Sequence, residues 1–338
     1  MNDWAEFRHF RYLLAIVEHK GLRAASEHLR TAEPNLSVQA KQFQEAFAIK
    51  LFRKGKDRRI QLTETGVAFK AIAQGLLDAR DEAIAALIAI ERGEIRTLSF
   101  GCAPFIDPEL FHLMCEMHKE VLPSCAIRPT HGDADQVVEE LVSGQLDAAL
   151  ISLPINDPRL RVVTIRRDRL VACLRADNPL AAKATVQSAD LRDHLAIFYH
   201  PQRHPDAHLR LLELLGEAGI EIDKFSRASH PSELQSLVKA GYGLALIREG
   251  TALEPDLTTR PIAGVDWAVD TAFVYNEKLH PKTIPVLARH LKRRLTVPPV
   301  KEDGLQTIGS PSTRVGNAKR PPHSDNRHRV IDSGRRSA

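Results

Sequence analysis

The sequence predicts an α/β protein that carries an all-α, winged domain at its N-terminus. Near the N-terminus, apolar residues recur at helical spacing, and a basic hairpin pattern follows them. From about residue 94 onward, short apolar strands alternate with amphipathic helices, an order that builds parallel sheets. A single long helical pattern connects these two parts of the chain.

Three short helices are expected in the N-terminal part. Residues 5–20 and 22–30 each place apolar side chains on one face, and the segment TAEPN then breaks the pattern. Pro34 opens the third helix, because the first turn of a helix does not need the N–H that proline lacks. A buried stripe of Leu36, Ala40, Phe43 and Phe47 leaves the polar side chains of this helix on its other faces.

A hairpin and a long helix are expected next. Residues 51–62 place the turn KGKD before an alternating strand, RIQL. Thr63 is a suitable N-cap, and the helix after it continues to about Glu91, a length of roughly 40 Å. Five apolar residues of this helix form a narrow seam of the kind that meets a partner helix. They are Ile72, Leu76, Ala83, Leu87 and Ile90.

Charge and composition narrow the function classes. Residues 1–62 hold twelve Lys and Arg against seven Asp and Glu, and residues 298–338 hold eight against four, within a net charge of +4. A basic start beside an acidic middle indicates nucleic acid as a partner at that end. Four cysteines without a CxxC pair indicate free thiols in a reducing cytoplasm. We expect no membrane span or signal peptide, and a disordered tail over 298–338.

Two short helices with a tight break, the second one polar, are typical of a helix-turn-helix that binds double-stranded DNA. Asn and Gln can both donate to and accept from adenine, Lys can reach guanine, and Ser37 is short enough to contact phosphate. Taken alone, the same residues also fit a solvated amphipathic helix beside a basic turn. The expected DNA contacts are Ala32, Asn35, Ser37, Val38, Gln39, Lys41, Gln42, Arg53, Lys54, Arg58 and Arg59.

The first sixty or so residues resemble the DNA-binding domain of the LysR-type transcriptional regulators. The matching positions are spread over this length and include Phe10, Ala24, Ala25, Leu29, Pro34, Leu36, Ser37, Gln39, Phe43, Glu45, Leu51, Phe52, Arg53, Leu62, Thr63 and Gly66. The resemblance implies a winged helix-turn-helix over 1–63, whose Pro34-led helix enters the major groove, and a dimer-forming linker helix over 64–93. Ala32 and Glu33 replace the family's usual Ser-Gln, and Val38 replaces a common polar or basic residue, so the operator sequence does not carry over.

The section after the linker resembles the effector domain of the same family. GQLDAALISLP matches at Gly144, Leu146 and Asp147, and DNPLA and LVKAGYGLALI also fit. The resemblance implies a two-lobed, periplasmic-binding-protein-like α/β domain over 94–297, with lobe I at about 94–165 and 268–297 and lobe II at about 166–267. A small-molecule effector would bind in the crevice at the carboxyl ends of the strands. The residues placed there are Ala103, Pro104, Phe105, His131, Asp133, Ser152, Tyr199, His200 and Ser232.

Three of these residues suggest the chemistry of the effector. Pro104 lacks an N–H donor, Phe105 adds an apolar face and Asp133 would repel an anion. We therefore hypothesise a neutral or cationic, partly apolar effector; the alternative is that Asp133 faces solvent and caps the next helix. Asp147 is expected to serve a cap or turn, and Gly241 with Gly243 a helix-terminating turn.

No cofactor, metal site or catalytic centre is expected. HPQRHPDAH at 200–208 contains ligand-type side chains, but two prolines disturb its backbone and no tetrahedral spacing appears. His112, Cys115 and His118 rotate around a helix at three-residue steps. Cys102 shows no resolving partner for redox sensing, and the sequence contains no HExxH, GxSxG or Walker motif.

The predicted function is a cytoplasmic LysR-type regulator that binds promoter or operator DNA as a homodimer or homotetramer. A small-molecule effector would change the relative placement of the paired DNA-binding heads. The rival hypothesis is a cytoplasmic small-molecule-binding protein or enzyme whose N-terminal helices serve assembly. Salt-dependent binding to DNA upstream of the protein's own coding sequence separates the two hypotheses.

Overall fold

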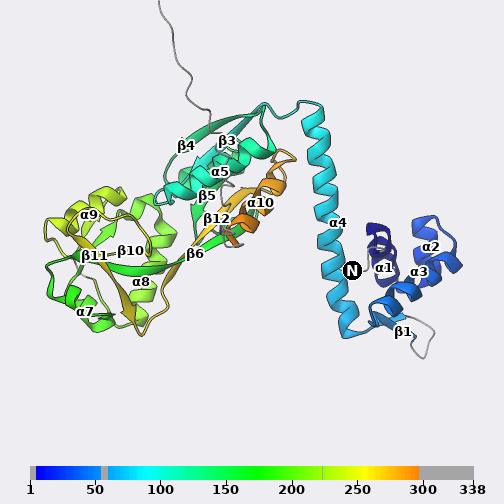
Figure 1. Cartoon of the computed structure of the whole chain (residues 1–338), viewed down its shortest axis with the longest axis horizontal. Coiled ribbons are helices and arrows are strands. Elements are labelled where there is room, and N and C mark those ends of the chain that lie inside the picture. The colour runs from blue at the N-terminus through cyan, green and yellow to red at the C-terminus, as the bar shows by residue number, and fades with distance from the viewer. Residues whose placement is uncertain (1–4, 55–59, 223, 297–338) are drawn as a thin grey trace, which may run out of the picture. The chain divides into compact units, whose positions relative to one another are not determined.

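A computed structural model of the chain describes residues 5–54, 60–222 and 224–296 (Figure 1). The predicted DNA contacts Arg58 and Arg59 and the predicted disordered tail, 298–338, lie outside the described residues.

The N-terminal part contains the predicted helices and hairpin. The helices are α1 (Phe7–Glu18), α2 (Leu22–Leu29) and α3 (Glu33–Ala46), and the strands are β1 (Phe52–Lys54) and β2 (Ile60–Leu62). The two strands pair antiparallel, with Phe52 opposite Leu62, as the hairpin prediction requires. Buried residues of all three helices, among them Ile16, Ala25 and Leu36, form one core.

The predicted long helix is confirmed as α4 (Glu64–Glu91). Thr63 caps it, because its Oγ1 accepts a hydrogen bond from the backbone N–H of Gly66 at 3.1 Å. Glycine is required at position 66, since an added Cβ would lie 1.9 Å from the carbonyl oxygen of Leu51. This close approach fixes where α4 starts beside the hairpin.

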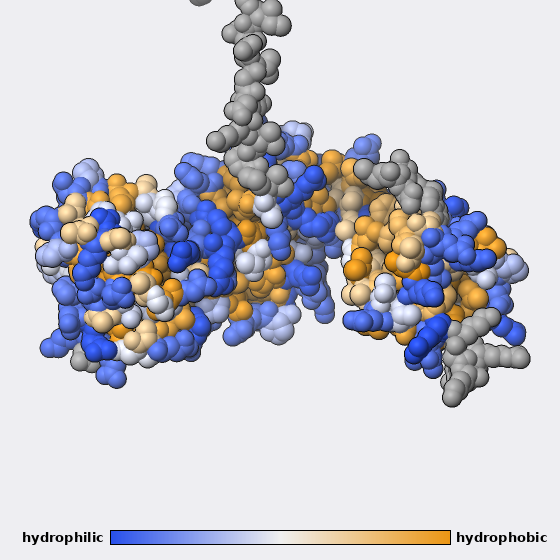
Figure 2. All heavy atoms as spheres, turned by 60° about the horizontal axis from the view of Figure 1, so that its bottom comes forward, coloured by the Kyte–Doolittle hydropathy of each residue, from blue (hydrophilic) through white to orange (hydrophobic). Residues whose placement is uncertain are grey.

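Two apolar stripes run along α4. Phe69, Ala73 and Leu77 are buried in the core of the N-terminal part. A second set remains exposed. It comprises Val67, Ile72, Leu76, Ile84, Leu87, Ile88 and Ile90. Figure 2 shows that hydrophobic areas of the surface, in orange, alternate with hydrophilic ones, in blue.

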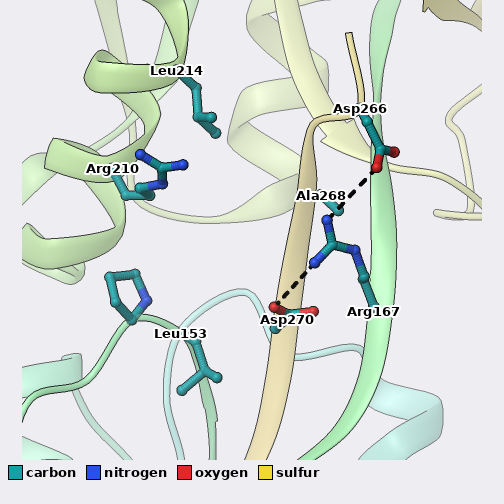
Figure 3. Close-up of a pocket in the computed structure, with 8 residues that line it drawn as sticks. Leu153, Arg167, Arg210, Leu214, Asp266, Ala268 and Asp270 are labelled. Atoms are coloured by element: carbon teal, nitrogen blue, oxygen red, sulfur yellow. Dashed lines mark ion pairs between the residues drawn. The ribbon is translucent and has the colours of Figure 1, made fainter.

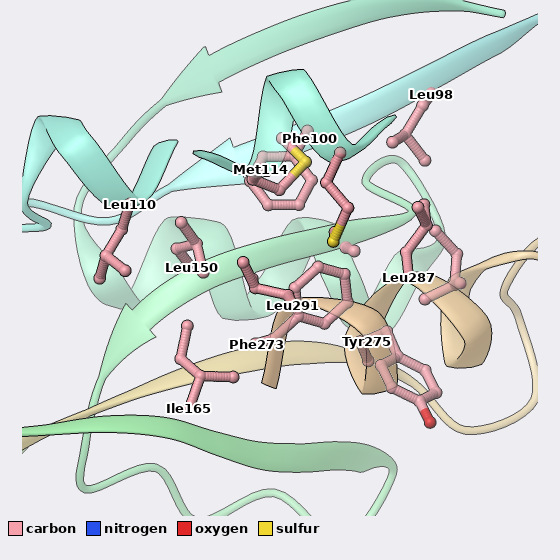
Figure 4. Packing of buried hydrophobic residues seen from close by; sticks show 14 of the residues in the cluster. Leu98, Phe100, Leu110, Met114, Leu150, Ile165, Phe273, Tyr275, Leu287 and Leu291 are labelled. Carbon is pink, nitrogen blue, oxygen red and sulfur yellow. The ribbon is translucent and has the colours of Figure 1, made fainter. Parts of the chain in front are cut away.

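Lobe I is the first half of the α/β part. Its strands are β3 (Thr97–Cys102), β4 (Ala126–His131) and β5 (Ala148–Ser152), and its helices are α5 (Pro108–Val121), α6 (Ala134–Ser143) and α10 (Ile284–Thr296). β3 pairs parallel with both β4 and β5, as the alternating pattern predicts. Figure 4 shows its core, in which Phe100, Met114 and Leu291 pack between sheet and helices.

Lobe II is built in a similar way. Its strands are β7 (Val186–Gln187), β8 (Leu195–Tyr199), β9 (Ser226–Ala228), β10 (Leu244–Arg248) and β11 (Leu257–Ala263). Its helices are η1 (Pro179–Ala182), α7 (Ser188–Arg192), η2 (Pro201–Arg203), α8 (Pro205–Glu217) and α9 (Pro231–Lys239). β8 pairs parallel with β9 and β10, and a second core surrounds Phe198, Leu215 and Trp267.

Two long strands connect the lobes: β6 (Leu160–Arg175) and β12 (Ala268–Asn276). They pair antiparallel with each other, and β6 also pairs antiparallel with β10 and β11. The expectation of a parallel order throughout is therefore wrong here, because the chain passes from one lobe to the other and returns. A register shift at Thr271 and Ala272 leaves Ile165 without an opposite residue, so β6 carries a bulge between the lobes.

Candidate DNA interface and effector crevice

The third helix separates a buried face from an exposed one. Leu36, Ala40 and Phe43 are at most 4% exposed, whereas Val38 is 50% exposed. Most of the residues predicted to contact DNA lie on the exposed side. They are Ala32, Asn35, Ser37, Val38, Lys41 and Gln42.

Charged groups of both signs lie on and near this face. Lys41 pairs with Glu45 one turn later at 3.6 Å, with both side chains exposed, so the pair is weak and easily exchanged for a phosphate. Arg53 is exposed on β1, and Lys54 ends the same strand. Glu33 occupies the first turn of α3 and is also exposed, which places a negative charge beside the basic ones.

Gln39 differs from the other polar residues of α3. It is only half-exposed, and its Oε1 lies 2.8 Å from Nε2 of His9, a buried residue of α1. The spacing in the sequence is consistent with this contact, because Gln39 lies three residues after Leu36 and four before Phe43, on the border of the buried stripe.

At the predicted crevice the two lobes are in contact, and two of the predicted residues meet there. Phe105 of lobe I stacks on Tyr199 of lobe II, with ring centroids 3.5 Å apart. Phe105 has a φ of 68°, in the left-handed region that favours glycine, so surrounding contacts must hold it there. Ala103 is buried before this turn, and its N–H donates to the carbonyl of Leu150. Pro104 lies between them, half-buried.

Asp133 was predicted either to repel an anionic effector or to face solvent and cap α6, and the structure shows a third arrangement. Asp133 occupies the N-cap position of α6, but its side chain makes no capping hydrogen bond. Instead, its Oδ1 accepts a hydrogen bond from Arg203 of lobe II at 2.7 Å. Because this guanidinium balances the carboxylate, the expected repulsion of an anionic effector loses its basis.

A second group of contacts between the lobes, made by largely buried polar side chains, centres on Arg248. Arg248 donates to Ser152 Oγ at 2.7 Å and to Thr271 Oγ1 at 3.1 Å, and it lies 3.7 Å from Asp168. Its side chain is 11% exposed. Burial lowers the pKa of Arg248, and the charge of Asp168 partly offsets that effect. The contacts join Ser152 of lobe I to lobe II through a satisfied set of hydrogen bonds.

Arg166 extends this group toward lobe I. It donates to Asp168 at 2.8 Å and to Asp107, the cap of α5, at 2.9 Å. His204 also crosses the crevice, since its Nε2 lies 2.6 Å from the carbonyl oxygen of Ser152. Two arginines and two aspartates therefore face one another in near balance.

The remaining predicted effector contacts lie apart from this group. His131 is exposed at the end of β4, near Phe111 of its own lobe. His200 caps η2, because its Nδ1 accepts from the N–H of Gln202 at 3.3 Å. Ser232 is exposed in the first turn of α9. None of these three contacts Ser152 or Arg248 among the interactions of the described residues.

Several residues that join the lobes were not among the predicted effector contacts. They are Asp107, Arg166, Asp168, Arg203, His204, Arg248 and Thr271. A usable signal existed for one of them. A charged residue at the end of a buried apolar strand needs a partner, and Arg248 occupies such a position.

A pocket of about 270 Å³ lies on the opposite face of the connecting strands (Figure 3). Leu153, Pro154, Arg167, Arg210, Leu214, Asp266, Ala268 and Asp270 line it. Arg167 lies 3.6 Å from Asp270 and 3.9 Å from Asp266, and Arg210 donates to Glu213 on its own helix. Because these charges already have partners, the lining does not select a ligand.

The other sequence hypotheses can be placed in the structure. Asp147 has a structural role, because its Oδ2 accepts from the N–H of Ser99 across the sheet at 2.7 Å. Gly241 has a φ of 86° directly after α9, which confirms the helix-terminating turn. Burial raises the pKa of the Cys102 thiol to about 12, the opposite of what an activated thiolate needs.

Two negative findings apply to the described part of the chain. It contains no group of three or more His, Cys, Asp and Glu side chains arranged to hold a metal ion. It also contains no helix with the length and apolar composition that crossing a membrane requires.

A winged helix-turn-helix, a long helix and a two-lobed α/β domain together define a class of DNA-binding regulators, and two family models agree. Residues 7–67 match the bacterial regulatory helix-turn-helix protein of the lysR family, and residues 91–296 match the LysR substrate binding domain. The chain therefore belongs to the LysR family of transcriptional regulators.

Curated relatives extend over most of the chain. The HTH-type transcriptional regulator BudR of Raoultella terrigena is 24% identical over 286 residues, which are 82% of this chain and 97% of BudR. The HTH-type transcriptional regulator BenM of Acinetobacter baylyi is 26% identical over 292 residues, or 80% and 93% of the two chains. Full-length CbnR, solved in complex with its target DNA, shares the fold with a TM-score of 0.52 and 22% identity, over 86% of this chain and 100% of CbnR.

Proposed function

We propose that this protein regulates transcription in the cytoplasm as a symmetric oligomer, and that a small-molecule effector modulates its binding to operator DNA. The observation that carries the proposal is the division of α3, whose apolar residues are buried and whose Ser37, Lys41 and Gln42 are exposed. A helix with this division, beside a basic hairpin, has the geometry that reads base edges in a major groove.

The exposed stripe of α4 supports pairing of two heads. Ile72 and Leu87 are 65% and 66% exposed, although both are large and apolar. Apolar residues repeated along one side of a 28-residue helix favour burial against a second copy of that helix. Two paired heads would bind a roughly palindromic operator.

The crevice supports the effector part of the proposal. The contacts that join the lobes there include Phe105 on Tyr199, Arg203 to Asp133, Arg248 to Ser152, and His204 to the carbonyl oxygen of Ser152. An effector that enters must replace some of these contacts, so it favours one arrangement of the lobes over another. The aromatic stack favours an effector with a flat apolar part, and the near balance of charge removes the earlier argument against anions.

The test of DNA binding is footprinting of the purified full-length protein on genomic fragments, including the region upstream of its own coding sequence. We expect a protected, roughly palindromic site, with affinity that falls steeply as salt rises. Ser37→Ala combined with Gln42→Ala should abolish protection and leave the fold intact. Protection that survives this pair of changes would contradict the assignment of α3.

The test of effector binding is a thermal-shift panel of small acids, amines and neutral compounds. A true effector should raise the melting temperature of the wild type, because a ligand that binds only the folded state stabilises it. It should not do so for Ser152→Leu, which fills the crevice beside Arg248. A compound that stabilises both proteins equally binds elsewhere.

A further inference from the structure

We propose that Gln39 is a positioning residue, which together with His9 clasps the recognition helix α3 onto α1 and does not itself read a base. The inference rests on the proposed DNA binding. It separates the base readers of α3, such as Gln42, from a residue that sets the helix in place.

The first step is the contact itself. The imidazole of His9 is buried in α1 at 4% exposure, and its Nε2 lies 2.8 Å from Oε1 of Gln39. The two residues are thirty positions apart, so this side-chain hydrogen bond joins the first helix to the third. A bond between a buried ring and a half-buried amide is shielded from water, which makes its geometry well defined.

The second step is the protonation of the ring. The backbone N–H of Glu6 donates to Nδ1 of His9 at 2.9 Å. A ring nitrogen that accepts carries no proton, so the neutral ring has its proton on Nε2. Nε2–H is therefore a donor, and only the oxygen of the Gln39 amide can face it. The capping of α1 thus determines the orientation of a side chain on α3.

The third step is the direction in which Gln39 points. It lies three residues after Leu36 and four before Phe43, and both of those are buried. It therefore lies on the flank of α3 that faces α1. Gln42 lies four residues after the exposed Val38 and is exposed itself, so it faces away from the domain. The two glutamines are chemically identical and differ only in what surrounds them.

Loss of the hydrogen bond between His9 and Gln39 should weaken every base contact that α3 makes. Base readout requires the helix to be held within roughly 0.5 Å of its productive position. If the clasp is broken, α3 can shift against α1, and all contacts from its exposed face weaken at once. Loss of a base reader would instead relax preference at a single base pair.

The experiment uses the full-length protein and the operator found by footprinting, with fragments that each change one base pair. Gln39→Met keeps the size of the side chain and removes the hydrogen bond. We expect roughly tenfold weaker binding to the operator, with the order of preference at every base pair retained. The matched control, Gln42→Met, should lose discrimination at one base pair and leave the others unchanged.

A second variant separates positioning from simple loss of packing. In Gln39→Glu the carboxylate can still accept from His9 Nε2–H, so binding should recover most of the affinity lost in Gln39→Met. Because the added charge repels phosphate whatever the role of position 39, the two variants are compared at the highest salt concentration at which wild type still binds, where that repulsion is screened. A base reader would still lose the donor of the amide there, so its Gln39→Glu variant would not recover. In His9→Phe the donor is gone, and adding Gln39→Met should then cost no further affinity.

The outcomes are distinct. Gln39→Met that relaxes one base pair as Gln42→Met does, or that binds as tightly as wild type, overturns the clasp and leaves DNA regulation standing. Gln39→Glu that binds more weakly than Gln39→Met also overturns it. A wild type without preference for any fragment overturns the proposed function, and the positioning role with it.

Discussion

The exposed face of α3 and the crevice between the lobes hold similar polar side chains in opposite conditions. On α3, Ser37, Lys41 and Gln42 lie in water. In the crevice, Ser152 and Arg248 are buried and bonded to each other. A surface that meets a partner outside the chain keeps its hydrogen-bonding groups hydrated, whereas a closed crevice must satisfy them internally.

Because of this difference, substitutions in the two regions should change different quantities. A change on α3 removes an interaction that exists only with DNA, so it should leave the stability of the protein nearly intact. A change in the crevice leaves a buried group unsatisfied, so it should appear in the unfolding free energy before any ligand is added.

Arg248→Met should give the largest effect. It removes the hydrogen bonds to Ser152 and Thr271, which are 4% and 0% exposed, and leaves both hydroxyls without their donor. We expect a loss of about 3 kcal/mol in the unfolding free energy. Denaturant titration measures it, with the exposed Arg210→Met of lobe II as a control that should change little. Equal stability of the two variants would contradict a closed crevice.

Lys41→Ala should change DNA affinity and not stability. The exposed pair with Glu45 contributes little to folding. A lost phosphate contact should weaken binding to all fragments alike and reduce the slope of log affinity against log salt by about one. Anisotropy titrations at several salt concentrations measure both, with Lys239→Ala on α9 as the control. A clear drop in stability would show that α3 is less independent of the core than its exposure indicates.

Phe105 allows a finer test of the crevice. Phe105→Ala and Phe105→Gly both remove the stack on Tyr199, so they differ mainly in backbone freedom. Because φ is 68° at this position, the glycine variant should be more stable than the alanine variant by about 1 kcal/mol. Denaturant titration of the pair gives the difference. An alanine variant at least as stable as the glycine variant would show that the turn relaxes once the ring is removed.

His118, in the core of lobe I, serves as a control outside both regions. Burial lowers the pKa of His118 below its usual 6.5, so the unfolded chain takes up the proton first. Its contribution to stability is therefore present above pH 6.5 and is lost as the pH falls below that value. We expect His118→Leu to lose less stability than wild type between neutral and mildly acidic pH. Identical pH profiles for the two proteins would show that this ring does not contribute.

The two regions also differ in how much the sequence revealed. The spacing of Leu36, Ala40 and Phe43 predicts the buried side of α3 from local sequence alone. The fourth residue of the predicted stripe, Phe47, is 38% exposed, because α3 ends at Ala46 before it. Thr63 marked the start of α4 in the same way. The crevice depends on contacts such as Asp133 with Arg203, seventy residues apart, and no local pattern pairs them. Resemblance supplied Phe105, Tyr199 and Ser152. It did not supply Arg248, the partner of Ser152, or Arg166 and Asp168 on β6, whose long antiparallel course was not predicted.

The bulged strand β6 carries charged side chains on both of its faces where it connects the two lobes. Arg166 and Asp168 point into the crevice, while Arg167 between them points to Asp266 and Asp270 on the reverse side. Neighbouring residues of a strand cannot rotate independently, so any twist that opens one side must disturb the ion pairs of the other. Strand β6 therefore couples the ion pairs on its two faces. A substitution at Arg167 should change the affinity for an effector bound between the lobes, although Arg167 lies on the opposite face.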